Sequence, residues 1–158
     1  MNLQNPLSDD AEIVDDLSTL SWVHDELRKS LDAAHKSLRR TLKEALARSG
    51  SDVDAADPAV LRAARALVHQ GVGALEMIGL PGPGRVLRAS ESALSRLIAR
   101  PKLLNAAAVS TIESASFSML DYLSRKLAGK NLPSLTLVPQ FKALQELASA
   151  DHVHPTDL

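Results

Sequence analysis

The sequence has no cysteine and only four aromatic residues: Trp22, Phe117, Tyr122 and Phe141. Disulfides and thiolate metal sites both need cysteine, so the sequence excludes a disulfide scaffold and a cysteine-ligated metal centre. A core poor in aromatic side chains and rich in alanine and leucine is typical of closely packed helices.

An excess of one charge is also missing, because 18 Lys and Arg residues face 19 Asp and Glu residues. This balance excludes a strongly basic nucleic-acid binder, so we expect no nucleic-acid partner. No run of about 18 apolar residues occurs, and we expect no membrane insertion. The N-terminal segment is acidic where a signal peptide would be basic, so we expect a cytoplasmic protein.

Apolar residues recur every three or four positions, which predicts helices. The first helix is expected from an N-cap at Ser18 to Ser49-Gly50, after a flexible acidic segment 1–17. The second should begin at Asp57-Pro58 and end at Gly79. The stripe of the first helix comprises Leu20, Val23, Leu27, Leu31, Ala34, Leu38, Leu42 and Ala45.

The remaining pattern predicts a third helix over 85–100, after a tight Pro-Gly turn at 81–84, and a fourth over 104–128. Residues 130–158 should form an extension, extended at first and with a short helix opening near Pro139. The predicted fold is therefore all-α: an antiparallel four-helix bundle over 18–129 with this extension. A coiled coil ranks lower because the helices stop and restart at Pro/Gly junctions.

On a helical wheel, His69 lies roughly 130° from the centre of the second helix's apolar stripe. The outer face of this second helix also carries Arg62, Arg65, Gly73 and Glu76. An exposed imidazole can offer a ring nitrogen to a phosphoryl group, and neighbouring cations can stabilise the added negative charge. From spacing alone, an ordinary surface histidine is the alternative interpretation.

Two glycines in the second helix need a reason, because a mid-helix glycine costs about 1 kcal/mol relative to alanine. Gly71 is on the core stripe, where it would allow close helix packing. Gly73 is on the outer face, where its missing side chain would let another protein's active site approach His69. The alternative is that Gly73 is a tolerated defect.

The segment LVHQGVGALEMIGLPGPGRVLRASE resembles the signature helix of histidine-containing phosphotransfer (Hpt) domains, with His69, Gly73 and Gly79 in register. The resemblance is closest to the N-terminal Hpt-like region of CheA-like hybrid kinases of the type IV pilus system, of the ChpA/PilL type, and to the related scaffold protein FimL. The stretches LSWVHDELRKSLDAAHKSLRR and VPQFKALQELASADHVHPTDL are also similar to that group. The resemblance covers nearly the whole chain.

This resemblance implies a four-helix bundle whose second helix carries the phosphorylated histidine. It implies phosphoryl transfer from a CheA-type kinase domain to His69, and then to an aspartate of a response regulator receiver domain. The setting would be control of type IV pili and twitching motility. The module would have no ATP site, no cofactor and no metal of its own, since the receiver brings Mg²⁺. Whether the module counts as an enzyme stays open.

One departure from the family pattern is Val72, where the family has a lysine that helps to hold the phosphoryl group. Arg65, and more distantly Arg62, could take over this role. We expect the receiver to dock over the outer face that includes Val72, Gly73 and Glu76. The alternative is a degenerate Hpt-like scaffold that binds partners, such as a pole-organising protein at the cell pole, without phosphotransfer.

The other histidines predict no metal site. His24 and His35 lie some 16 Å apart along one helix, too far to share an ion, and we expect both to be solvated. His152 and His154 lack further ligands nearby. No Glu-x-x-His pair occurs, which disfavours a di-metal bundle, and the serines at 114, 116 and 118 are interpreted as packing residues. The chain resembles a domain excised from a longer protein.

Overall fold

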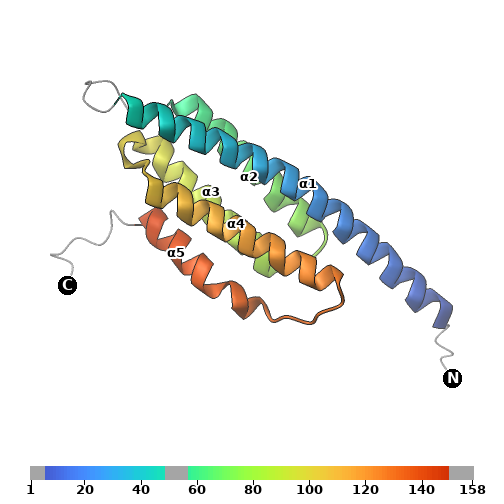
Figure 1. The fold of residues 1–158 in the computed structure, drawn as a ribbon. Coiled ribbons are helices and arrows are strands. Elements are labelled where there is room, and N and C mark those ends of the chain that lie inside the picture. Colours follow the sequence, from blue (N-terminus) through green and yellow to red (C-terminus); the bar gives the residue numbers. More distant parts are fainter. Residues whose placement is uncertain (1–5, 49–56, 150–158) are drawn as a thin grey trace.

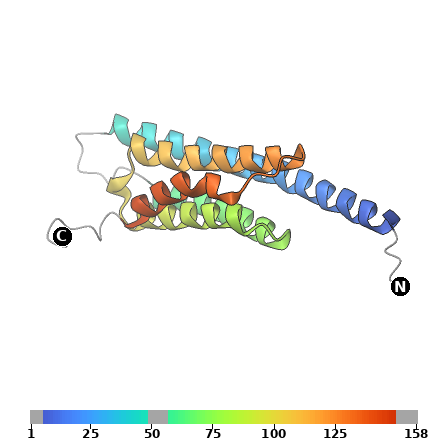
Figure 2. The same ribbon diagram turned by 90° about the horizontal axis from the view of Figure 1, so that it is seen from below.

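The computed structural model describes residues 6–48 and 57–149, with side chains from residue 17 onward. Within these ranges the chain is helical and has no strand, which confirms the all-α prediction. The helices pack side by side into a bundle (Figures 1 and 2). The elements are α1 (Pro6–Ala47), α2 (Pro58–Met77), α3 (Pro81–Ala99), η1 (Pro101–Leu103), α4 (Ala106–Leu127), η2 (Ser134–Leu137) and α5 (Val138–Ser149), the two η elements being 3₁₀-helices.

One apolar core joins these helices, and it contains the predicted stripes. Burial of leucine, valine and alanine side chains supplies the main favourable term for such a bundle. No large aromatic ring lies at its centre, as the composition suggested, and only Tyr122 among the four aromatics is buried. The most deeply buried large side chains are Leu27, Leu31, Leu38, Leu61, Leu75, Leu87, Leu94, Leu97, Ile112, Met119, Leu123 and Leu144.

Local chemistry determines both ends of α2, as predicted. The Asp57 carboxylate accepts a hydrogen bond from the Ala59 amide at 2.9 Å, and Pro58 occupies the first turn. At the other end, Gly79 adopts a positive φ of 72°, and the Leu80 amide donates to the Leu75 carbonyl at 3.2 Å. This Schellman geometry turns the chain sharply into α3. The predicted stop at Gly129 is confirmed by the same geometry at the end of α4.

Two predicted helix starts are wrong. α1 begins at Pro6 rather than Ser18, so it runs through most of the segment expected to be flexible, and its N-terminal part extends past the other helices (Figure 1). Proline in the first turn and acidic residues after it both favour a helix N-terminus. α3 begins at Pro81 rather than Arg85, because the first amides of a helix have no intrahelical partner and proline costs nothing there. The predicted tight turn at 81–84 is therefore the first turn of α3.

The C-terminal extension packs on the bundle. η2 lies within the stretch predicted to be extended, and α5 begins one residue before Pro139. Leu144 is fully buried, and the Arg96 guanidinium of α3 donates to the Leu147 carbonyl of α5 at 2.5 Å. These contacts attach α5 to α3. The His152–His154 pair lies outside the described residues.

None of the helices in the described part of the chain combines the length and apolar character needed to cross a bilayer.

Candidate functional site

His69 projects from the outer face of α2, with 71% of its side chain exposed. The opposite face of α2 is buried through Leu61, Val68 and Leu75, so the predicted orientation of His69 is confirmed. Its Nδ1 lies 2.8 Å from Oε1 of Glu91, which is on α3. The site is therefore an exposed imidazole whose Nδ1 is paired with a carboxylate of the next helix.

Glu91 reaches His69 because α2 and α3 run in opposite directions from the turn at Gly79-Leu80. Arg65 of α2 donates to the Ser95 hydroxyl of α3 at 3.3 Å, and Arg88 of α3 pairs with Glu76 of α2. Sequence reasoning missed Glu91. The turn itself was the available signal, since Glu91 follows it by about as many residues as His69 precedes it.

The carboxylate of Glu91 determines which nitrogen of His69 is free. An ionised carboxylate can only accept hydrogen bonds, so Nδ1 of His69 carries the hydrogen and donates it. In the neutral ring the other nitrogen, Nε2, then carries the lone pair. Because the side chain is mostly exposed, this lone pair is available to a reactant from solution or from another protein.

The two mid-helix glycines have different surroundings. A Cβ on Gly71 would lie 2.6 Å from Leu27 Cδ2 and 2.9 Å from Leu87 Cδ1, so this glycine lets α1 and α3 approach α2 closely, as predicted. A Cβ on Gly73 would meet nothing within 4 Å. No packing in the described structure accounts for Gly73, which leaves a bare stretch of helix between His69 and Glu76.

The three arginines near His69 differ in exposure and in the side chains that they contact. Arg65, one turn before His69, is half-buried and directed toward Ser95. Arg62, a further turn away along the same helix, is exposed. Arg88 comes from α3 and pairs with Glu76, so that carboxylate of the predicted docking face already has a partner within the chain.

Val72 is only 3% exposed, so the prediction that its side chain contributes to a docking rim is wrong. The apolar face of α2 is wide enough to include both Gly71 and Val72, because α2 packs between α1 and α3. The position at which the family resemblance aligns a lysine is therefore inside the core. Gly73 and Glu76 are exposed and remain on the outer face.

A second polar group lies between α1 and α4, and it overturns the prediction that His35 is solvated. His35 is 7% exposed, and its Nε2 lies 3.0 Å from the Ser116 hydroxyl. That hydroxyl donates to the Ile112 carbonyl at 3.1 Å, so His35 Nε2–H is the donor to Ser116. Burial lowers the pKa of His35, and the Glu113 carboxylate opposes this shift. His35 is thus a neutral core residue at pH 7.

Glu113, 8% exposed, receives two hydrogen bonds of 2.5 Å from the Arg39 guanidinium. The ion pair lies one helical turn from His35 and Ser116 on each helix, so the four side chains connect α1 to α4. A buried carboxylate needs such a partner. We assign this group a role in helix association.

No cluster of three or more histidine, aspartate or glutamate side chains in the described ranges could hold a metal ion. Comparisons of the chain with protein-family models, with curated proteins and with solved structures give no match. The features of this chain that bear on its function are therefore the geometry at His69 and the motif around it.

Proposed function

We propose that this chain is a histidine-containing phosphotransfer module with His69 as its phosphorylated residue. The observation that carries the proposal is the His69–Glu91 pair, which directs the lone pair of the neutral imidazole to Nε2 at an exposed position. The resemblance of the α2 motif to Hpt domains supports it, and in this interpretation α1 to α4 form the antiparallel four-helix arrangement of that family.

The chemistry needs little from this chain besides the imidazole. The Nε2 lone pair of His69 attacks the phosphorus of the donor, the N–P bond forms, and the bond from phosphorus to the leaving oxygen breaks. The ring then carries positive charge, which the hydrogen bond from Nδ1–H to Glu91 stabilises. In the second transfer, a receiver aspartate attacks phosphorus and the N–P electron pair returns to Nε2.

Gly73 suits the approach of a partner in this proposal. The donor and the acceptor must each bring an active site within bonding distance of Nε2. A bare helix surface one turn from His69 removes the side chain that would stand in the way. Arg65 and Arg62 supply positive charge on the preceding turns, and the receiver would bring its own Mg²⁺.

The biological setting that we propose follows from the resemblance alone. The module would receive phosphoryl groups from a CheA-type kinase domain and pass them to a response regulator that controls type IV pili and twitching motility. It would act in the cytoplasm, with a position near the pole where that apparatus assembles.

A second candidate, a docking scaffold without phosphotransfer, is favoured by Val72. With a buried valine at the position of the family lysine, α2 lacks the cation that the family uses to hold the phosphoryl group. In this alternative, the outer face of α2 binds a receiver or a pole-organising protein, and His69 takes part only through contact.

The two candidates differ in one experiment. The chain is incubated with a CheA-type kinase domain and radiolabelled ATP, beside the variant His69→Gln and the control His24→Gln. Phosphotransfer predicts an acid-labile, base-stable label that His69→Gln abolishes and His24→Gln keeps. If the unaltered chain binds a receiver domain but takes no label, the scaffold is supported instead.

A further inference from the structure

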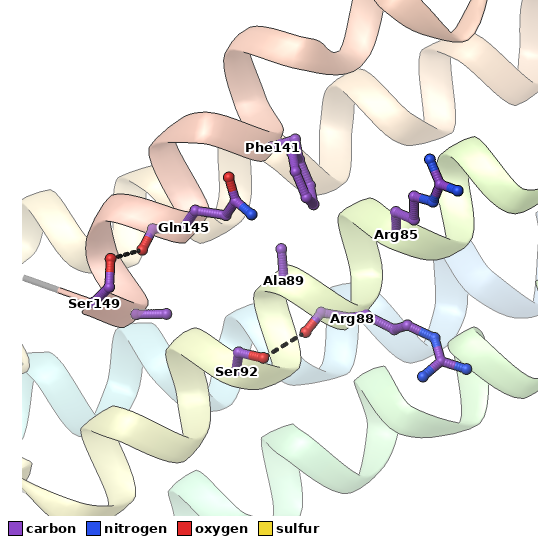
Figure 3. Close-up of a pocket in the computed structure, with 8 residues that line it drawn as sticks. Arg85, Arg88, Ala89, Ser92, Phe141, Gln145 and Ser149 are labelled. Carbon is purple, nitrogen blue, oxygen red and sulfur yellow. Dashed lines mark hydrogen bonds between the residues drawn. The ribbon is translucent and has the colours of Figure 1, made fainter.

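A surface trough of about 580 Å³ runs between α3 and α5 (Figure 3). Two helices form its walls, and it opens between them to solvent. Its volume is in the range of small-molecule ligand pockets. The side chains that define it include Arg85, Ala89 and Ser92 of α3, and Phe141, Gln145 and Ala148 of α5.

The floor of the trough is apolar. Ala89 and Ala148 contribute methyl groups, and the ring of Phe141 lies over the gap between the two helices (Figure 3). The Ser92 hydroxyl donates to the Arg88 carbonyl at 3.1 Å, so its hydrogen is used within α3. The trough therefore offers an occupant hydrophobic contact along most of its length.

One end of the trough is positively charged. Arg85 is exposed, and among the described residues it forms no ion pair with a carboxylate. Arg88 also borders the trough, although its guanidinium pairs with Glu76. None of the residues that line the trough is acidic. An occupant should therefore bring negative charge to this end and apolar surface to the rest.

We propose that the trough binds a short, extended segment of a protein partner that combines an acidic side chain with one or two apolar side chains. The acidic group would contact Arg85, and the apolar groups would cover Phe141 and Ala89. From Arg85 to Ser92 the wall is about 10 Å long, which accommodates about three extended residues. Because the trough opens along the surface, the partner chain can continue beyond both ends. This interaction does not depend on phosphotransfer at His69.

A random decapeptide display library tests the proposal on the full chain. Selection is run against the unaltered chain and against two variants, Arg85→Glu and Ser92→Trp. The first reverses the charge at the end of the trough, and the second fills the trough while keeping both arginines. Arg40→Glu and Ser110→Trp are matched controls, since both residues are exposed on other helices.

The proposal predicts enriched peptides that share an acidic residue next to apolar residues. It predicts that Arg85→Glu weakens their binding about tenfold and that Ser92→Trp abolishes it, with the two controls unchanged. Changes in amide chemical shift on binding should concentrate in α3 and α5.

Three results would each overturn the proposal: enriched peptides without an acidic residue, amide shifts confined to other helices, or no enrichment on the unaltered chain over Ser92→Trp. So would displacement of bound peptide by octanoate at equal concentration, which would indicate a small amphiphile as the ligand. Recovery of binding only after removal of residues 150–158 would assign the trough to this chain's own C-terminal segment.

Discussion

Exchanging each of the two mid-helix glycines of α2 for alanine separates packing from partner access. Both residues lie in the same helix, so the gain in helix propensity is similar for the two changes, about 1 kcal/mol. At Gly73 a new Cβ meets nothing within 4 Å, and Gly73→Ala should stabilise the fold by about 0.5–1 kcal/mol.

At Gly71 the same Cβ would lie 2.6 Å and 2.9 Å from methyl carbons of Leu27 and Leu87. Both leucines are buried, so their side chains cannot swing into solvent. Overpacking of this kind costs about 1–3 kcal/mol, which offsets or exceeds the propensity gain. The free energies of unfolding of the two variants should therefore differ by about 1–3 kcal/mol, with Gly73→Ala the more stable.

Urea titration and thermal unfolding of both variants measure this difference, which corresponds to roughly 2–12 °C in Tm. Equal stability of Gly71→Ala and Gly73→Ala would refute the packing assigned to Gly71. The same variants also test whether Gly73 gives a partner access to His69. Gly73→Ala should slow phosphoryl transfer between His69 and a receiver domain despite its added stability, and it should leave phosphorylation by a small-molecule donor unchanged. If Gly73→Ala is more stable and transfers the phosphoryl group as fast as the unaltered chain, Gly73 is not needed for partner access.

Three further changes test the remaining assignments. Glu91→Ala should slow phosphorylation of His69 about three- to tenfold, measured by single-turnover labelling, because the imidazolium that forms loses its carboxylate; unchanged rates would contradict the pairing. Val72→Lys should destabilise the fold by at least about 2 kcal/mol in urea titration and should not speed labelling, because the ammonium enters the core; a stable and faster variant would show that position 72 faces solvent. Burial lowers the pKa of His35 below its unfolded value of about 6.5, so the folded state disfavours its protonation and stability is lost as pH falls below that value. His35→Gln should lose less stability than the unaltered chain between pH 7.5 and pH 5, and equal losses would show that His35 does not couple folding to pH.

The features of this fold that sequence could predict are those determined by a few neighbouring residues. Asp57-Pro58 and Gly79 define α2 because capping and positive φ are local requirements. The outward direction of His69 follows from helical periodicity in the same way. The start of α3 was missed because a Pro-Gly run suits either a turn or a first helical turn, and only the positions of the flanking helices decide between the two.

The site could be predicted only in part, because its second half comes from another helix. The spacing of residues along α2 does not indicate that the Glu91 carboxylate of α3 pairs with His69 Nδ1. Val72 was misjudged because a residue near the edge of an apolar stripe is buried or exposed according to how its neighbours pack. His35 was misjudged for a related reason: α1 contacts α4 as well as α2, and periodicity showed only one of its two buried faces.

Labelling of the full chain with phosphoramidate as the donor shows directly whether Nε2 of His69 is a nucleophile. Phosphorus and ¹⁵N-histidine NMR then identify which ring nitrogen of which histidine is phosphorylated. This assignment predicts that phosphate appears first at Nε2 of His69, more slowly in Glu91→Ala, and with no such signal in His69→Gln. Phosphate that appears first on another histidine, or at Nδ1 of His69, would contradict it.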